Sequence, residues 1–217
     1  MFVKNSAKVP VKSRLAAALD SQTALSLYRC FVADLLDTIG RAEWPLVIFF
    51  YPPDGDAKMK AWLGKGCVLA PQRGDDLGER MRNAFEEVFF QGFESALLIG
   101  SDIPDLPDSI LKEACDSLRT NDAVVGPALD GGYYLIGFNH DTFKPEAFAG
   151  IPWSTSNVFE QTMGTLREMG LRVHELPFWR DVDTLDDLEA LFLRSAATNF
   201  SSSATMQYLK NLKGEGG

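Results

Sequence analysis

Short apolar runs that alternate with amphipathic stretches constrain the fold of this 217-residue chain more than any other feature. Several of the runs are apolar throughout, which is typical of strands that helices cover on both faces. The stretches between them carry apolar residues three or four positions apart, and this spacing predicts helices. The alternation predicts an α/β fold with a mostly parallel central sheet flanked by helices. We expect strands at 2–4, 46–51, 67–70, 96–99, 123–125, 133–138 and, more weakly, 172–178, and helices within 25–39, 77–89, 110–118, 159–169 and 185–192.

The composition, 46% hydrophobic and 24% charged, is that of one soluble globular domain. We expect that domain to span residues 1–195 and a polar C-terminal tail to span 196–217, with a short helix around 206–212. No apolar stretch approaches the ~20 residues of a membrane span. Three cysteines without metal-ligand spacing and the lack of a signal peptide predict a cytoplasmic protein.

The net charge of −9 disfavours nucleic acid as a partner, because an acidic surface repels a phosphate backbone. One local exception is a basic cluster near the amino terminus, made of Lys4, Lys8, Lys12 and Arg14 with no acid before Asp20. Such a cluster suits phosphate, although a solvated basic terminus explains it equally well. Neither a P-loop nor a G-x-G-x-x-G motif occurs, so a kinase-type ATPase and a Rossmann dehydrogenase are poorly supported.

Carboxylates follow two of the expected strands, at the sheet edge where open α/β folds bind ligands. Asp102 ends an apolar run, where a carboxylate is costly without a cation or hydrogen-bond donors. It is therefore a candidate ligand for Mg²⁺ or Mn²⁺ that grips a diphosphate. The alternative is that Asp102 binds backbone amides and that Asp105 or Asp108 caps a helix. Asp181 and Asp183 share one side of an extended segment and are candidates for a second metal ligand.

Three other segments carry weaker signals. The turn Asp130-Gly131-Gly132 either forms a hairpin or leaves room for a substrate whose hydroxyls bond to Asp130. The glycines of the 72–81 loop allow a flat ligand to approach, or an aspartate of that loop caps the next helix. Trp153 either packs in the core or lines the site. Ser154 or Thr155, directly after it, suits a helix N-cap. Thr184 and Asp187 have the spacing of a capping box.

Six motifs follow one another along the chain: Lys12-Ser13-Arg14-Leu15, Asp76-Leu77-Gly78-Glu79-Arg80-Met81, Gly100-Ser101-Asp102-Ile103-Pro104, Gly126-Pro127-Ala128-Leu129-Asp130-Gly131-Gly132-Tyr133-Tyr134, Trp153-Ser154-Thr155 and Asp181-Val182-Asp183-Thr184. In this order the sequence resembles a bacterial family of nucleotide-diphospho-sugar transferases, part of which is assigned to arsenosugar-biosynthesis glycosyl transfer. The resemblance covers roughly the first 190 residues. It departs from the family at residues 5–11, where the basic loop lacks glycine.

The resemblance implies a single-domain GT-A-like fold, shared with metal-dependent nucleotidyltransferases such as molybdenum-cofactor and phospholactate guanylyltransferases. By this resemblance Lys12 and Arg14 face phosphate, Asp102 binds the metal, and Asp181 or Asp183 takes the second metal position. Nucleotide and substrate are expected against Gln72, Gly78, Arg80, Gly131, Gly132, Trp153, Ser154 and Thr155.

These features lead to the hypothesis of a glycosyltransferase that uses Mg²⁺ or Mn²⁺, a nucleotide-sugar donor and a small-molecule acceptor. Its catalytic residues would be Lys12, Arg14, Asp102 and Asp130. One alternative is a nucleotidyltransferase that joins a nucleoside triphosphate to a phosphorylated acceptor and releases pyrophosphate. A second is a nucleotide-binding module without catalysis. The sequence does not determine the oligomeric state.

Overall fold

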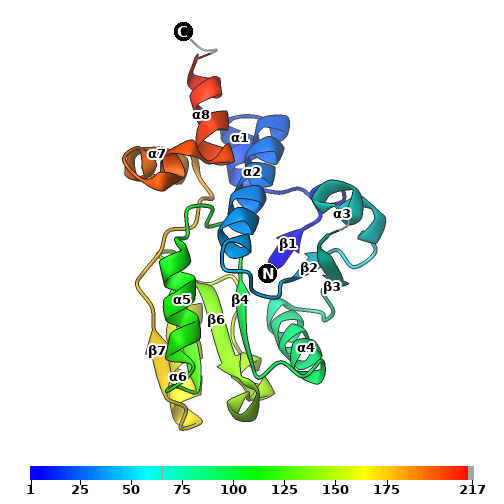
Figure 1. Cartoon of the computed structure of the whole chain (residues 1–217), viewed down its shortest axis with the longest axis vertical. Helices are drawn as coiled ribbons and strands as arrows, with labels where there is room; N and C mark the ends of the chain where they lie inside the picture. Colours follow the sequence, from blue (N-terminus) through cyan, green and yellow to red (C-terminus); the bar gives the residue numbers. More distant parts are fainter. Residues whose placement is uncertain (65, 215–217) are drawn as a thin grey trace.

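The computed structural model describes residues 1–64 and 66–214, and in it helices surround two neighbouring sheets (Figure 1). The strands are β1 (Phe2–Lys4), β2 (Val47–Tyr51), β3 (Val68–Pro71), β4 (Ser95–Ile99), β5 (Ala123–Pro127), β6 (Tyr133–Asn139) and β7 (Val173–Glu175). The helices are α1 (Ser13–Ala18), α2 (Ser21–Gly40), α3 (Asp56–Leu63), α4 (Leu77–Phe90), α5 (Asp108–Ser117), α6 (Val158–Glu168), α7 (Leu185–Ser195) and α8 (Ala204–Gly214), with short 3-10 helices η1 (His140–Thr142), η2 (Pro145–Phe148) and η3 (Asn199–Ser202). No helix within these described ranges is long and apolar enough to cross a membrane.

The strands pair as predicted for an α/β fold, but in two sheets rather than one. The first sheet, β1-β2-β3, is parallel, and the second has the order β4-β6-β5-β7. In the second sheet β5 and β7 are parallel, whereas β6 runs antiparallel to both β4 and β5. The predicted α/β fold is thus confirmed, but the strands form two sheets where one central sheet was expected.

A seam between β1 and β4 separates the two sheets. Towards the carboxyl ends of the strands, the hydroxyl of Tyr28 on α2 bridges them, since it accepts the Lys4 amide at 2.7 Å and lies 3.1 Å from Ser101 Oγ. Towards the other end, a mostly apolar cavity of about 360 Å³ is lined by residues that include Met1, Val47 and the 95–99 strand. A side-chain hydroxyl therefore joins the carboxyl ends of the two strands where a backbone ladder would otherwise run.

Side chains cap several of the helices, and two of the predicted caps form, at the starts of α4 and α7. Asp20 caps α2 by accepting two backbone amides, and Asp76 caps α4 by accepting the amide of Glu79. Thr184 and Asp187 form a complete capping box at the start of α7, as their spacing predicts. The N-cap position of α5 is Pro107, so the cap considered at Asp105 or Asp108 does not form. That of α6 is Asn157, so the capping role predicted for Ser154 or Thr155 is wrong. The Thr155 hydroxyl instead donates to the carbonyl oxygen of Pro152.

Three apolar clusters hold the molecule together, and one of them lies directly behind the candidate site. It joins α1, α2, α7 and α8 through buried residues that include Leu15, Phe31, Val182 and Leu191. Leu15 is three positions after Lys12, and Val182 lies between Asp181 and Asp183. Burial of these two apolar side chains in one cluster brings the basic segment to the acidic one.

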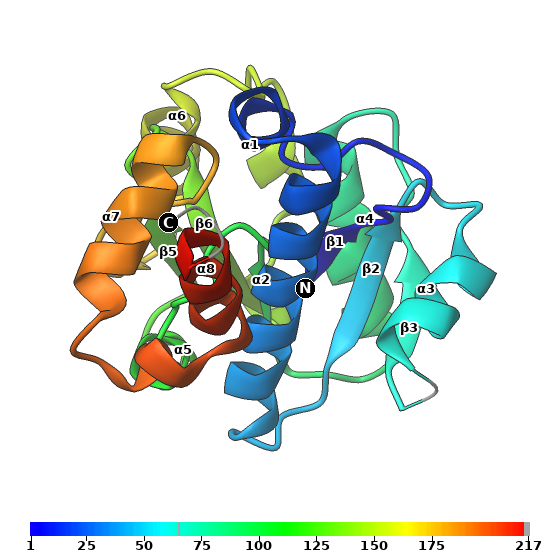
Figure 2. The ribbon, with the colours of Figure 1, turned by 90° about the horizontal axis from the view of Figure 1, so that it is seen from above.

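The C-terminal segment packs against the rest of the protein through α8, which lies beside α2 (Figure 2). Met206 and Leu209 are buried in the cluster shared with α2. The buried carboxylate of Asp34 on α2 accepts the amides of Ala204 and Thr205, at 2.8 and 2.9 Å, at the start of α8. The short helix expected around 206–212 thus forms part of α8, and residues 215–217 of the predicted tail lie outside the described residues.

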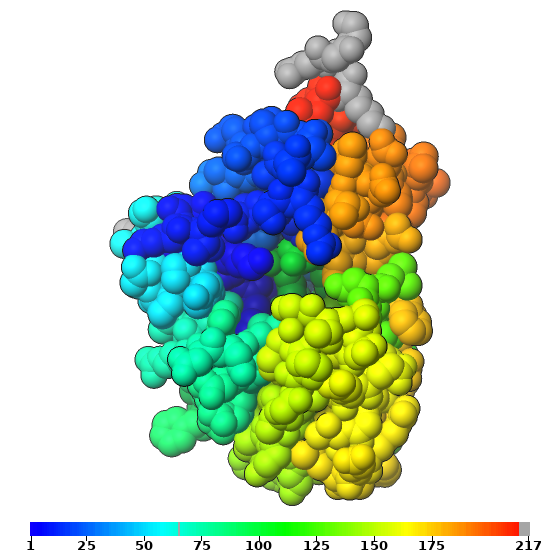
Figure 3. All heavy atoms as spheres, turned by 180° about the vertical axis from the view of Figure 1, so that it is seen from behind, coloured from blue at the N-terminus to red at the C-terminus, as the bar shows by residue number. Residues whose placement is uncertain are grey.

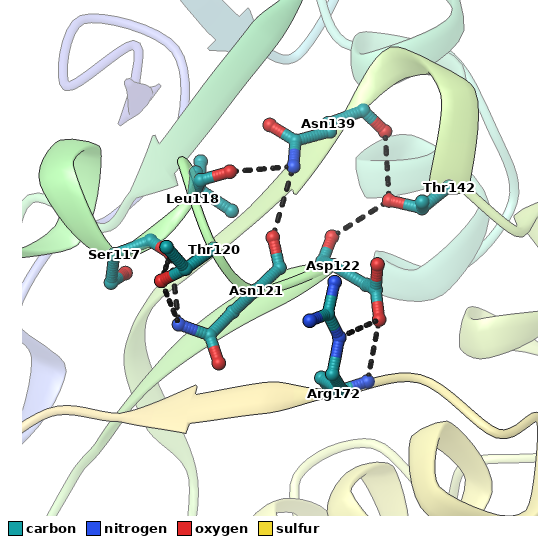
Figure 4. Close-up of polar contacts among 8 residues, drawn as sticks. All are labelled: Ser117, Leu118, Thr120, Asn121, Asp122, Asn139, Thr142 and Arg172. Atoms are coloured by element: carbon teal, nitrogen blue, oxygen red, sulfur yellow. Dashed lines mark hydrogen bonds and ion pairs between the residues drawn. The ribbon is translucent and has the colours of Figure 1, made fainter.

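At the opposite end of the second sheet, a polar network fixes the entry into β5 (Figure 4). The Asp122 carboxylate accepts the backbone amide of Arg172 at 2.7 Å, and this hydrogen bond holds its pKa below the ordinary value. The Asn139 amide donates to the carbonyl oxygens of Leu118 and Asn121. These bonds join the turn after α5 to the end of β6 and the start of β7, away from the carboxylate cluster described next.

Candidate active site

Lys12 is the centre of the site. It precedes α1 in a left-handed conformation, with φ of 49°, and its side chain is only 2% exposed. Its ammonium lies 2.6 Å from Asp102 Oδ1 and 2.8 Å from Asp183 Oδ1. The two carboxylates are more open, with 38% and 41% of their side chains exposed. The structure thus joins three of the predicted site residues in one ion cluster.

Backbone contacts explain why these residues converge. The carbonyl oxygen of Asp102 accepts the amide of Val182 at 2.8 Å, so the loop after β4 runs beside the segment after β7. Asp181 and Asp183 flank Val182, and the charges of Asp102 and Asp183 both act on Asp181. Asp130, from the turn between β5 and β6, also acts on Asp181 through its charge.

Burial and the charges of this cluster together shift the pKa values of Lys12 and Asp181. Burial alone lowers the pKa of Lys12, but the charges and hydrogen bonds of Asp102 and Asp183 outweigh it, so the pKa is raised. The pKa of Asp181 is raised to about 8, first by burial and then by the charges of Asp102, Asp130 and Asp183. The structure therefore holds Lys12 charged and, without an added cation, favours the protonated form of Asp181.

A pocket of about 130 Å³ opens at this cluster. It is lined by Lys4, Val11, Lys12, Ser13, Arg14, Tyr28, Asp102 and Asp183. Figure 3 shows a hollow on this face where the N-terminal segment meets segments from the middle and the C-terminal part of the chain. Lys8, the remaining member of the predicted basic cluster, pairs with Asp54 instead. Three of the four predicted cations thus border one small polar pocket.

Asp105 has a different role from the helix cap considered for it. Its side chain is 6% exposed and receives two bonds from Arg194 on α7, at 2.7 and 3.0 Å, and one from the Trp179 indole at 3.2 Å. This bidentate pair attaches the loop that carries Asp102 to the helix that follows Asp183. Sequence reasoning missed it, because no local pattern links residues 89 positions apart.

Tyr28 is the other residue that the sequence did not single out. It lies on the buried face of α2 at helical spacing, which marks it only as a core residue. In the structure its hydroxyl reaches the polar pocket beside Asp102, and burial raises its pKa first, followed by the charge of Asp102. The sequence signal that could have pointed to it is a tyrosine on the apolar face of a helix, because a buried tyrosine hydroxyl usually has a hydrogen-bond partner.

Gln72 and Arg80 lie near each other at the end of the first sheet. The buried Gln72 amide donates to the carbonyl oxygen of Phe49 at 2.9 Å. The Arg80 guanidinium lies 4.3 Å from the centre of the Tyr51 ring and donates to the carbonyl oxygen of Gly74. Within the described residues both side chains shape their own loop, and their contact with a nucleotide stays a prediction.

Two predicted glycines have clear packing roles. A Cβ on Gly78 would lie 2.6 Å from the indole nitrogen of Trp153, so glycine allows that ring to pack onto α4. Trp153 packs against the cluster formed by residues of α4, β6 and η2. Gly131 has φ of 89°, and a Cβ there would lie 2.0 Å from the carbonyl oxygen of Ser156. These two glycines therefore permit close contacts with residues 153–156.

The turn Asp130-Gly131-Gly132 joins the antiparallel strands β5 and β6, so it forms the hairpin that was one of its two predicted roles. Asp130 is exposed and accepts the amide of Gly132 at 2.9 Å, so its carboxylate stabilises its own turn. Ser154, with φ of 70°, and Thr155 are also exposed. All three stay candidates for substrate contact, since none is committed to the core.

The carboxylate pair fits a hydrated divalent cation better than an all-protein cage. Across residues 1–64 and 66–214, no group of three or more His, Cys, Asp or Glu side chains is arranged to hold a metal ion. Asp102 and Asp183 nevertheless direct one oxygen each at a single cation, the Lys12 ammonium. Mg²⁺ keeps several waters and typically uses about one or two protein carboxylates, so this pair has suitable donors.

Comparison with known proteins identifies the family. A family model described as "Uncharacterized protein conserved in bacteria (DUF2064)" matches residues 35–155. The chain belongs to this family. A crystal structure from Desulfovibrio desulfuricans G20, of a "putative nucleotide-diphospho-sugar transferase", is 41% identical and covers 98% of this chain and 93% of its own, with a TM-score of 0.94. The predicted resemblance to a bacterial family of such transferases is confirmed.

More distant matches have a nucleotidyltransferase-like fold. The 2-phospho-L-lactate guanylyltransferase of Methanobrevibacter smithii is 24% identical over 93% of this chain and 85% of its own length. A manganese complex of Rv0371C from Mycobacterium tuberculosis H37Rv is 18% identical over 74% of this chain and 84% of its own, with a TM-score of 0.52. A cytidylyltransferase structure from Leptospira borgpetersenii matches at a TM-score of 0.52. The DUF2064 chain thus shares its architecture with nucleotidyltransferases.

Proposed function

We propose that this DUF2064 protein is a metal-dependent nucleotidyltransferase. It would join a nucleoside triphosphate to a phosphorylated small molecule and release pyrophosphate. In this reaction a phosphate oxygen of the acceptor attacks the α-phosphorus, and the bond from that phosphorus to the bridging oxygen breaks. The observation that carries the proposal is the pair Asp102 and Asp183, which converge on one cation beside a pocket lined by Lys4 and Arg14.

The charges of the site explain why a cation is needed. Four carboxylates gather here, since the charges of Asp102, Asp130 and Asp183 all act on Asp181. Such a cluster repels a triphosphate unless cations compensate it. A divalent ion held by Asp102 and Asp183 would supply Lewis-acid stabilisation of the pyrophosphate leaving group. Arg14, exposed at the pocket, would donate to phosphate oxygens.

The fold similarity supports this reading over glycosyl transfer. The guanylyltransferase relative aligns over 93% of this chain, and the cytidylyltransferase structure has the same architecture. Glycosyl transfer from a nucleotide-sugar is the second candidate, because the structure with 41% identity is described as a nucleotide-diphospho-sugar transferase. Both reactions place a diphosphate beside a divalent ion, so the same residues serve either one.

The products distinguish the two reactions. The purified protein would be incubated with each nucleoside triphosphate, a panel of sugar phosphates and phosphorylated hydroxy acids, and Mg²⁺ or Mn²⁺. Acceptor-dependent release of pyrophosphate is expected for nucleotidyl transfer. Release of a nucleoside diphosphate from a nucleotide-sugar, with no pyrophosphate from any triphosphate, would replace the proposal with glycosyl transfer. Binding of a nucleotide without turnover across the whole panel would favour a non-catalytic module.

Asp102→Ala tests the assignment of the carboxylate pair. We expect turnover to fall by at least ~100-fold, the loss typical for one preorganised electrostatic group. Asp54→Ala is the matched control, because Asp54 pairs with Lys8 on the surface, apart from the Lys12 cluster. A folded Asp102→Ala protein with the turnover of the control would contradict the assignment.

A further inference from the structure

The lysine expected to bind phosphate is held by the carboxylates expected to bind metal. Lys12 has a 2% exposed side chain, and its ammonium contacts Asp102 and Asp183 at 2.6 and 2.8 Å. An ammonium in this position fills the space between the two oxygens that a metal would share. A metal bound to both oxygens would lie about 2.0–2.1 Å from each, and two cations that close repel strongly. The ammonium and a metal ion therefore cannot occupy the pair together.

We propose that Lys12 and the divalent cation are alternative occupants of the Asp102–Asp183 pair, so that metal binding displaces Lys12 towards the phosphate pocket. The inference rests on the proposed function only in assigning a metal to this pair. It gives Lys12 two successive partners: the carboxylates before metal binding and phosphate oxygens afterwards. It also reconciles the contacts of Lys12 in the structure with the phosphate role that the sequence suggests.

The exposure of the three groups allows this exchange without unfolding. The carboxylates are 38% and 41% exposed, so a hydrated ion can reach them from solvent, whereas Lys12 approaches them from the interior. Lys12 belongs to the lining of the pocket that also contains Arg14 and Lys4, and a rotation of its flexible stem is enough to change partners. The Phe31 ring, 5.5 Å from the ammonium, forms an apolar wall behind it.

The exchange lowers the metal affinity of the free protein. Two partly exposed ion pairs must break when the metal binds, and each such pair is worth a few-fold in a binding constant. Together they predict an affinity about tenfold weaker than that of the same carboxylates without Lys12. A triphosphate offsets this loss, because it provides the displaced ammonium with new anionic partners.

The first experiment measures Mn²⁺ binding to the full chain, by the loss of the electron paramagnetic resonance signal of free Mn²⁺. Lys12→Met keeps the apolar stem and removes the charge, and we expect it to bind Mn²⁺ about tenfold more tightly than the wild type. Lys8→Met is the matched control, because it removes a charge from the same segment at a surface pair with Asp54. Its affinity should equal that of the wild type. Equal affinity of Lys12→Met and Lys8→Met would overturn the exchange and leave the metal site in place.

A second experiment uses the wild-type protein, so it holds even if Lys12→Met does not fold. Brief acetylation of amines followed by peptide mass spectrometry reports how accessible each lysine is. Without metal, Lys12 should be protected, and saturating Mn²⁺ should increase its labelling severalfold while Lys8 stays unchanged. Continued protection of Lys12 with Mn²⁺ bound would overturn the inference alone. If neither the wild type nor either variant binds Mn²⁺, both this inference and the metal dependence of the proposed function are overturned.

Discussion

The pair between Arg194 and Asp105 offers a quantitative test of how the two acidic segments are held together. Arg194 Nε lies 2.7 Å from Asp105 Oδ2, and a second guanidinium nitrogen lies 3.0 Å from Oδ1. The Asp105 side chain is 6% exposed, whereas that of Arg194 is 30% exposed. Arg194→Met keeps most of the apolar stem and leaves a buried carboxylate with the 3.2 Å bond from Trp179.

The expected loss follows from this burial. Removing one partner of a fully buried pair costs about 3–5 kcal/mol, and the partial exposure of Arg194 places the expectation near ~3 kcal/mol at the lower end of that range. For a chain of this size that loss lowers Tm by roughly 6–12 °C. Asp105→Asn combined with Arg194→Met removes the unpaired charge and should recover most of the stability. The double variant therefore separates the cost of a stranded carboxylate from the cost of lost packing.

The assay is urea unfolding at pH 7 of the wild type, both single variants and the double variant, which completes a thermodynamic cycle. Arg180→Met serves as a control, because Arg180 makes a longer, more exposed pair with Asp187, at 3.5 Å, and should lose less than ~1 kcal/mol. If Arg194→Met is as stable as Arg180→Met, or if the two changes in the cycle are additive, the reasoning about this pair is refuted.

Three further outcomes are expected. Asp34→Ala should cost about 1–3 kcal/mol in the free energy of unfolding, because two amides of α8 lose their acceptor, while Asp37→Ala on the exposed face of α2 should be nearly neutral in the same urea titration. Gly131→Ala should yield little folded protein by circular dichroism, since its φ is 89° and the added Cβ would lie 2.0 Å from the Ser156 oxygen. Asp181 has a pKa raised from 3.8 to about 8, so its contribution to stability is complete below the unfolded pKa and is lost as pH rises towards 8. In chelator-containing buffer, stability should therefore fall between about pH 4 and pH 8 in the wild type relative to Asp181→Asn, and parallel curves would contradict the shift.

Most of the elements could be predicted from the sequence because their signals are local. Each expected strand is present, and the capping box at Thr184 and the cap at Asp76 follow from spacing alone. The helix α3 was not expected, because its eight residues contain a single buried side chain, Met59, and show no clear apolar face. The cap predicted at Ser154 or Thr155 failed because the chain continues to Asn157 before α6 begins.

The candidate site was predicted in its parts but not in its arrangement. The order of the motifs marks Lys12, Asp102 and Asp183 as functional candidates, and alternation relates Asp181 to Asp183. Neither feature indicates that one ammonium would bridge two of these carboxylates across 171 positions of sequence. That contact depends on the left-handed turn at Lys12 and on the burial of Leu15 and Val182 in one cluster.

Local chemistry in the chain therefore settles where strands and helices begin and end, because periodicity and caps act over a few residues. The contact across the seam between the two sheets depends instead on Tyr28, whose hydroxyl joins Lys4 to Ser101, 24 and 73 positions away in the sequence. The attachment of Asp105 to Arg194 likewise spans 89 positions. Such partners are selected by the packing of whole elements against one another, and only the folded chain brings them within hydrogen-bonding distance.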